Sequence, residues 1–236
     1  MNHLQQRETV AKTRSSTYDS FLDKLKELAD HLRTHENINI QATSSRSFET
    51  RNKFYAYPAA QQNLIISNFN NYYDTCQELI TSGHGLRDKM RNVLTHLKLH
   101  RLRIPTDSVL SITEGSCVEL YDKNCVQTFR SPEFFQYTSH SLEDLVVLPY
   151  PELFDRSFER SKDCMVAVMQ VLSGTAQMVP EFCPDHIVRE INSEKKIISK
   201  SKGTLLSALM SETSDEVLGF LHVFEVRNQH QLTFVH

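Results

Sequence analysis

The stretch DKNCVQTFRSPEFFQYTSHSLEDL, residues 122–145, changes its structural character twice and thereby decides the fold. A run of β-branched and aromatic residues at 126–129 is typical of a short strand. It gives way at Ser131-Pro132-Glu133 to an aromatic cluster, and Ser141-Leu142-Glu143-Asp144 then has the composition of a helix start. The stretch therefore predicts a short strand followed by two very short helices.

The residues after this stretch continue as one longer helix and three strands. Residues 157–172 have helical periodicity, which stops at Ser173-Gly174. Strand-like runs follow at 177–190, 196–209 and 216–226. Shorter strand-like runs are found at 108–112, 117–121 and 125–130. This order predicts an α+β fold with antiparallel pairing among the last strands.

The N-terminal part of the chain is predicted to be mostly helical. Residues 1–16 are polar and unperiodic, so we expect disorder there. A helix follows, and its apolar stripe must be buried against another surface. The stripe consists of Phe21, Leu25, Leu28 and Leu32. Residues 35–53 lose the periodicity and are predicted to be a linker or a mobile loop.

Two further helices are separated by a turn at Gly83-His84-Gly85. The first of them begins after Tyr57-Pro58, and the second ends before Pro105. The second carries apolar residues at helical spacing: Leu86, Met90, Val93 and Leu97. We expect a helical hairpin whose apolar faces form a bundle or a dimer interface. The expected domains are an N-terminal helix with a linker (1–53), the hairpin (54–104) and an α+β domain (105–229).

The composition is that of an ordinary globular protein. Of the 236 residues, 39% are hydrophobic and 23% are charged, which is sufficient for a core. No run approaches the roughly 18 uncharged apolar residues of a membrane span, and the N-terminus lacks the apolar segment of a secretory signal. The five cysteines form no CxxC pair, so we expect reduced thiols. These observations predict a cytoplasmic protein, or a nuclear one in a eukaryote, with no membrane partner.

The sequence contains no recognisable catalytic motif. GxSxG, Walker, HExxH and protein-kinase motifs are missing, and six glycines leave little material for phosphate-binding loops. We therefore predict that the chain is not an enzyme.

The order of elements resembles that of a PAS domain over roughly residues 105–229. PAS sequences typically run from two strands with an acidic turn to short helices with an aromatic residue, a Ser-x-Glu-Glu/Asp-Leu helix start, a longer helix and three strands. The matching segments are Asp122-Lys123-Asn124, Ser131-Pro132-Glu133-Phe134, Ser141-Leu142-Glu143-Asp144-Leu145, Ser157 to Gly174, and residues 177–226. The sequence departs from the pattern at residues 146–149, where a glycine is usual, and at 193–195, where Asp-Gly is usual. An unrelated α+β fold is the alternative.

The resemblance implies a PAS-like five-stranded antiparallel sheet with flanking helices that enclose an apolar cavity. The hairpin at 59–103 would cover the opposite face of the sheet and form a homodimer. Candidate ligand-binding residues, each of which could instead simply fill the core, are Phe135, Phe154, Cys164, Met169 and His222.

The resemblance leaves the cofactor unknown. Light-sensing LOV chemistry is excluded because residues 146–156 contain no cysteine. Residues 157–174 contain no histidine for haem, although Cys164 could ligate iron. A flavin or a small apolar ligand is compatible with such a cavity.

The helix before Pro105 carries two further candidate sites. His96 and His100 have the i, i+4 spacing of metal ligands, but no carboxylate or cysteine accompanies them, which favours a solvated pair without a metal. The helix is also basic, and residues 1–103 hold 15 Lys/Arg against 10 Asp/Glu, whereas residues 104–236 hold 11 against 19. Candidate contacts to nucleic-acid phosphates are Arg87, Lys89, Arg91, Lys98, Arg101 and Arg103. The solvated face of an amphipathic helix is the simpler interpretation.

These observations favour a PAS-type sensory or regulatory protein that binds a small ligand or a partner protein and signals through dimeric N-terminal helices. Two other functions stay open. A DNA-associated transcription regulator would use the basic helix, and a ligand-free structural adaptor would dock through its apolar helix faces.

Overall fold

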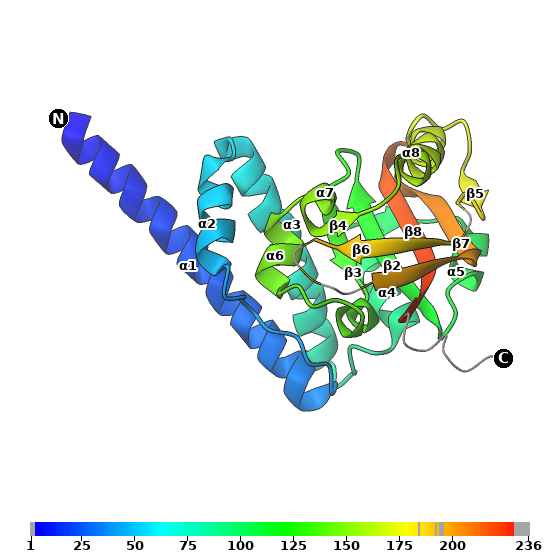
Figure 1. Ribbon diagram of the computed structural model, residues 1–236, viewed down its shortest axis with the longest axis horizontal. Helices are drawn as coiled ribbons and strands as arrows, with labels where there is room; N and C mark the ends of the chain where they lie inside the picture. Colours follow the sequence, from blue (N-terminus) through cyan, green and yellow to red (C-terminus); the bar gives the residue numbers. More distant parts are fainter. Residues whose placement is uncertain (1–2, 184, 192, 194–195, 229–236) are drawn as a thin grey trace.

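The computed structural model describes residues 3–183, 185–191, 193 and 196–228 of the chain. Within these residues, a group of N-terminal helices lies against a curled antiparallel sheet, and a second set of shorter helices lies over the other side of the sheet (Figure 1). The predicted α+β class with antiparallel pairing is confirmed.

Four helices make up the N-terminal part of the fold: α1 (His3–His35), α2 (Ser47–Ala56), α3 (Ala59–Thr81) and α4 (Lys89–Leu99). The predicted stripe of α1 is buried, with Leu25, Leu28 and Leu32 at most 1% exposed. Disorder was predicted for residues 1–16, but the helix already begins at His3. These residues have good helix propensity without an apolar stripe, and periodicity reports burial rather than helicity.

The predicted linker at 35–53 is only partly irregular, because α2 begins at Ser47 inside it. With only Thr50 and Phe54 buried, α2 is too short to show a stripe. The turn after α3 agrees with its prediction. Gly83 adopts a φ of +74°, and His84 N–H donates to the Leu79 carbonyl at 2.8 Å, which is the closing bond of a Schellman motif.

The strands are β1 (Leu102–Arg103), β2 (Ser116–Asp122), β3 (Gln127–Arg130), β4 (Phe154–Asp155), β5 (Met178–Pro180), β6 (His186–Glu190), β7 (Lys196–Ser211) and β8 (Val217–Asn228). Their order across the sheet is β3-β2-β8-β7-β6-β4, and β1 and β5 also pair with β7. The first hairpin, β2–β3, therefore lies beside the last strand, β8, although about 90 residues separate β3 from β8 along the chain.

Two strand predictions were wrong in detail. In the run at 108–112, residues 108–110 belong to a helix, α5 (Thr106–Leu110), which begins directly after Pro105. A run this short does not distinguish a strand from a helix by its period. The run at 177–190 is two strands, β5 and β6, because the chain turns between them, with Glu181 at a φ of +46°.

The opening stretch folds as its sequence predicts. After β3 come a 3-10 helix, η1 (Pro132–Gln136), and α6 (Leu142–Val147), followed by α7 (Tyr150–Leu153) and α8 (Phe158–Leu172). Ser141 and Asp144 form a reciprocal capping box at the start of α6, which satisfies backbone N–H groups that a helix start leaves without partners.

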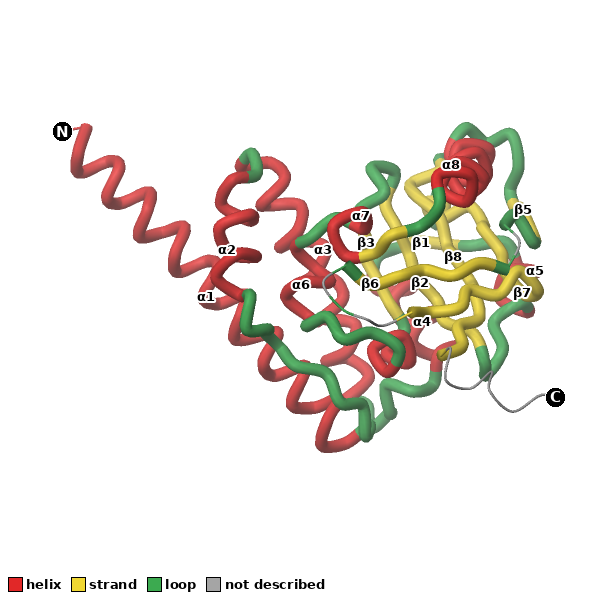
Figure 2. Tube along the Cα trace, in the orientation of Figure 1, coloured by secondary structure: helices red, strands yellow, loops and turns green. Residues whose placement is uncertain are grey.

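The two faces of the sheet have different covers (Figure 2). On one face, the Phe129 ring lies 5.6 Å from the Tyr72 ring of α3 and 5.2 Å from the His96 ring of α4, so the hairpin covers this face as expected. On the other face, Arg130 contacts the Phe134 ring of η1, and α8 packs Val168 and Val171 against the sheet. One buried core continues from the helices into the sheet.

Hydrogen bonds attach α6 to the N-terminal helices. Tyr18 in α1 donates to the buried Glu143 carboxylate at 2.6 Å, and Thr50 in α2 donates to Asp144 at 2.6 Å. The loop before α2 adds two bonds from the backbone of α6, to the carbonyls of residues 41 and 42. These contacts cross both of the predicted domain boundaries, at 53/54 and 104/105.

Candidate functional site

A row of three ionisable side chains crosses the sheet on the face opposite the helical hairpin. Glu119 in β2 pairs in register with Arg130 in β3 on one side and with His222 in β8 on the other. Directly opposed residues on neighbouring strands point to the same face, so register alone brings the three together. Glu119 and Arg130 are buried, at 5% and 7% exposed, and His222 is half-buried.

The Glu119 carboxylate is fully engaged. Oε1 accepts bonds from Arg130 Nε at 2.7 Å and Gln127 Nε2 at 3.1 Å, and it pairs with Arg130 Nη2 at 2.7 Å. Oε2 accepts from the Tyr121 hydroxyl at 2.7 Å and lies 3.4 Å from His222 Nδ1. Burial raises the pKa of Glu119, but the Arg130 charge and the His222 and Tyr121 contacts outweigh it and lower the pKa to about 2.

A small, partly open cavity of about 40 Å³ lies against this row. It is enclosed by the sheet, η1, α7 and the segment between β4 and α8. Its lining residues are Glu119, Arg130, Phe134, Tyr150, Phe154, Arg156, Val188, His222, Phe224 and Val226. This volume holds about three water molecules, which is far below the ~300 Å³ of a drug-sized site.

Arg156 brings a second guanidinium to the cavity. Its Nη2 donates to the Tyr150 hydroxyl at 2.8 Å, and its Nη1 donates to the Cys164 sulfur at 2.9 Å. The Tyr150 ring also lies 4.9 Å from the guanidinium carbon. Neither hydrogen-bond partner is a carboxylate, so Arg156 forms no ion pair through these two bonds.

Two N–H groups of these arginines are buried without a hydrogen-bond partner in the structure, Arg130 Nη1 and Arg156 Nε. Buried polar groups are paired in the great majority of cases, and an unpaired one on a charged residue is costly. The residues around the cavity therefore combine two arginines, each with an unpaired buried nitrogen, with aromatic and aliphatic side chains. Glu119, ionised and saturated with donors, is a poor general base, so the arrangement suits binding better than proton transfer.

No family model, curated protein or solved structure matched this chain. The site must therefore be interpreted from its own chemistry. Among the residues that the structure describes, no helix has the length and apolar character needed to cross a membrane, and no three His, Cys, Asp or Glu side chains group as metal ligands.

The five predicted ligand-binding residues lie in different places. Phe154 and His222 line the cavity beside Glu119. Cys164 adjoins it through Arg156, whereas Phe135 lines a second cavity between the sheet and α3. Met169 is 57% exposed on the outer side of α8, because α8 packs its opposite side on the sheet.

Sequence reasoning missed Glu119, Arg130, Tyr150 and Arg156. One signal was present: Glu119 stands in the middle of a strand whose other central residues are apolar, where a carboxylate needs a partner. The rest of the site could not be found in this way, because Tyr150, Arg156 and His222 come from separate segments that only the folded chain brings to Glu119 and Arg130.

The histidine pair of α4 is not solvated as predicted. His96 is 1% exposed, and its Nδ1 lies 2.9 Å from the Thr75 hydroxyl, which itself donates to the Asn71 carbonyl. His96 therefore carries its proton on Nδ1 and donates it to Thr75. His100 Nε2 lies 3.2 Å from the same Asn71 carbonyl.

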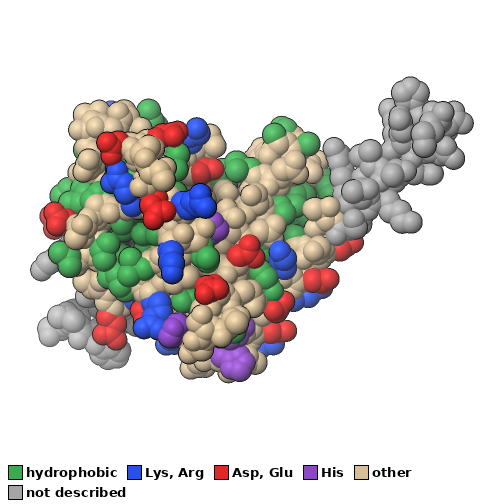
Figure 3. Space-filling model, turned by 180° about the vertical axis from the view of Figure 1, so that it is seen from behind, with side chains coloured by type: hydrophobic (Ala, Val, Ile, Leu, Met, Phe, Trp, Pro, Cys, Tyr) green, Lys and Arg blue, Asp and Glu red, His purple; other side chains and the backbone are tan. Residues whose placement is uncertain are grey.

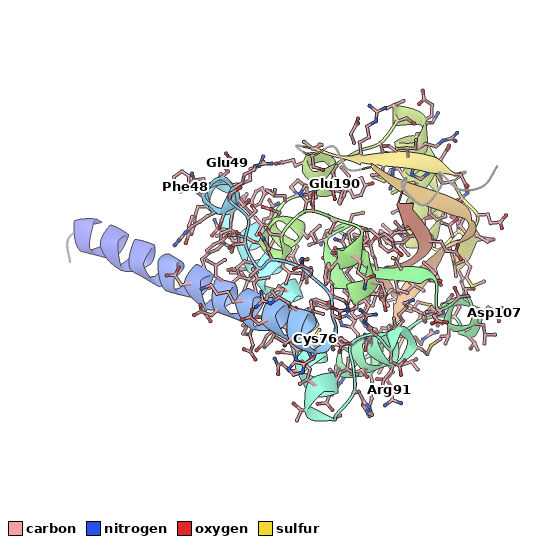
Figure 4. All side chains as sticks on the ribbon, turned by 60° about the horizontal axis from the view of Figure 1, so that its bottom comes forward. Phe48, Glu49, Cys76, Arg91, Asp107 and Glu190 are labelled. Carbon is pink, nitrogen blue, oxygen red and sulfur yellow. The ribbon has the colours of Figure 1, made fainter. Side chains whose placement is uncertain are left out.

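Several of the candidate nucleic-acid contacts bind the protein itself. Lys89 is buried against the carbonyls of residues 113 and 114, Arg87 donates to the Glu36 carbonyl, and Arg103 pairs with Asp215 at 2.6 Å. Arg91 extends away from the body of the molecule but forms an ion pair with Asp88 (Figure 4). Lys98 and Arg101 are exposed, at and just beyond the C-terminal end of α4. On the face shown in Figure 3, basic and acidic side chains are interspersed.

Proposed function

We propose that the chain is a PAS-like regulatory module that takes a small ligand into the cavity beside Glu119. The observation that carries the proposal is a cavity lined by Arg130 and Arg156, each of which keeps one buried guanidinium nitrogen without a hydrogen-bond partner. A rigid core without a binding role gains nothing from such groups, because unpaired buried donors destabilise it.

The order of elements supports the PAS-like assignment. Two strands, short helices, a longer helix and a three-strand antiparallel meander follow one another, as the sequence resemblance requires. The helical hairpin covers the sheet face away from the cavity, where the resemblance expects it.

Arg130 offers a route from the cavity to the N-terminal helices. It lines the ligand cavity and also a second cavity, whose walls include Asn68, Phe69 and Tyr72 of α3. A ligand that engages Arg130 would favour one packing of β3 against α3 over another, which is a shift between states already accessible to the protein. In this proposal, the changed packing alters the surface of α3 and α4, to which a partner regulatory protein binds.

A homodimer through the N-terminal helices needs surfaces other than the predicted stripes. Those of α1, α3 and α4 are largely buried within the chain, including Leu28, Phe69 and Val93 at no more than 2% exposed. Phe48 of α2 is 76% exposed and points outward, and it is the better candidate for a contact between chains (Figure 4).

Native mass spectrometry of the purified full chain, compared with its denatured mass, tests the proposal. A bound ligand appears as additional mass that is lost on denaturation. Filling the cavity with the Val188→Phe substitution should abolish that mass. Ile187→Phe is the matched control, because Ile187 is the neighbouring residue of β6 and is 46% exposed. Identical bare masses for all three proteins, together with no response of the wild-type chain to added small molecules, would contradict the proposal.

A further inference from the structure

The charges around the cavity do not balance. Arg130 and Arg156 contribute two positive charges, and Glu119 contributes the one negative charge among the lining residues. Every interaction of the Glu119 carboxylate is directed to Arg130, Gln127, Tyr121 or His222. Among the described ion pairs none includes Arg156, so its charge is left without a counter-ion next to the cavity.

The donors left free have the form of an anion site. Arg130 is held rigidly, because two of its nitrogens contact one carboxylate oxygen and its guanidinium lies 4.2 Å from the Phe134 ring centre. Its third nitrogen, Nη1, has no hydrogen-bond partner in the structure, although the residue is 93% buried. Arg156 Nε is free in the same way, while its two other nitrogens are fixed by Tyr150 and Cys164. Guanidinium N–H groups oriented by such contacts bind oxyanions with little loss of side-chain freedom.

The remaining walls and the volume restrict the anion. Phe154, Phe224, Val188 and Val226 supply an apolar surface that suits a short hydrocarbon group. A single unbalanced positive charge matches a monoanion, whereas inorganic phosphate carries more charge near neutral pH and has no apolar part. About 40 Å³ accommodates a carboxylate with one or two further carbons.

We propose that the cavity binds a small monocarboxylate, of which acetate is the simplest probe, held by the guanidinium groups of Arg130 and Arg156. This inference rests on the proposed function, because it assigns the ligand class of the same cavity. Arg156 and Tyr150, the more exposed lining residues, mark the side from which the ligand enters.

The test is a titration of the isotope-labelled full chain with sodium acetate, followed by amide NMR signals of β2, β3 and β8 at fixed chloride concentration. Acetamide serves as the neutral analogue of the same shape. For a ligand of four heavy atoms we expect a dissociation constant between about 0.05 and 10 mM. Acetamide should bind at least about tenfold weaker, because it leaves the charge of Arg156 unbalanced.

Three variants separate the role of Arg156 from a general effect on folding. Arg156→Gln should weaken acetate binding at least about tenfold, and Arg156→Lys should retain part of the affinity because it keeps the charge but loses the planar fork. Arg160→Gln, in the exposed pair with Asp163, should bind acetate like the wild type. Circular dichroism of each variant verifies that it is folded.

The outcomes distinguish this inference from the proposed function. Equal binding of acetate and acetamide at the cavity, or unchanged acetate binding by folded Arg156→Gln, would overturn the carboxylate assignment and leave a neutral-ligand module. If no small molecule, charged or neutral, shifts the cavity signals, both proposals fail.

Discussion

His96 should make the protein less stable as the pH falls below about 6.5. Its imidazole is buried between α3, α4 and β3, and burial lowers its pKa to about 3, with a smaller effect from the charge of His100. In the unfolded chain, His96 therefore binds a proton near pH 6.5, whereas in the folded chain it binds one only near pH 3. Between these values the unfolded state binds more protons, so the free energy of unfolding decreases as the pH decreases.

The slope is half of about 1.4 kcal/mol per pH unit at pH 6.5 and approaches that full value at lower pH, so from pH 6.5 to 5.0 the loss amounts to about 1.6 kcal/mol. Urea unfolding followed by circular dichroism at pH 7.5, 6.5, 5.5 and 5.0 measures it. His96→Asn, whose amide nitrogen can still donate to Thr75, is the reference protein because it does not titrate. It should be less stable at pH 7.5, since the smaller side chain packs less well, but its stability should change less with pH.

The difference between the two proteins isolates His96. The lowered pKa of His31 and the raised pKa of Glu133 affect both proteins equally and cancel. Glu119 contributes only below about pH 4.5, where its carboxylate begins to be protonated in the unfolded chain. Equal pH slopes for wild type and His96→Asn between pH 7.5 and 5.0 would show that the folded protein accommodates a charged His96, contrary to this reasoning.

Two further predictions concern the sheet. Glu119→Gln leaves the buried Arg130 without its counter-charge and should lower the free energy of unfolding by about 3–5 kcal/mol in urea titrations. Glu49→Gln, in an exposed pair, should change the free energy of unfolding by less than about 1 kcal/mol. Similar values for the two variants would refute the buried pairing of Glu119 with Arg130. Gly219→Ala places its methyl group onto the carbonyl of the paired strand β2 and should destabilise by more than about 2 kcal/mol, against about 1 kcal/mol for Gly83→Ala, where φ is positive but space is open. Thermal unfolding measures this pair, and a ranking in the reverse order would contradict the described register.

The features that sequence predicted well are determined locally. The apolar spacing of α1, the glycine turn after α3 and the start of α6 at Ser141 each depend on residues within one or two turns. Their interactions are satisfied by neighbours in the chain, so the sequence pattern contains the information. The order of strands and short helices after Pro105 was predictable for the same reason, except in runs too short to show a period.

The candidate site depends on long-range pairing instead. Arg130 meets Glu119 across a hairpin, but His222 reaches it only because β8 returns to lie beside β2 in one register. A shift by one residue would turn His222 to the opposite face of the sheet. Likewise, His96 looked solvated on a basic helix, and only the position of Thr75 on the neighbouring helix shows that it is buried and bonded.

The bond between Tyr18 and Glu143 also has a consequence for how this sequence can change over evolutionary time. Loss of the Tyr18 phenol alone would leave the Glu143 carboxylate, which is 0% exposed, without its hydrogen-bond donor. Loss of the carboxylate alone would leave the buried phenol without its acceptor. Neither position can drift by itself without a penalty, although 125 residues separate them. In divergent descendants of this chain, positions 18 and 143 should therefore change together, and a record of paired substitutions there would reveal the contact between α1 and α6 without any structure.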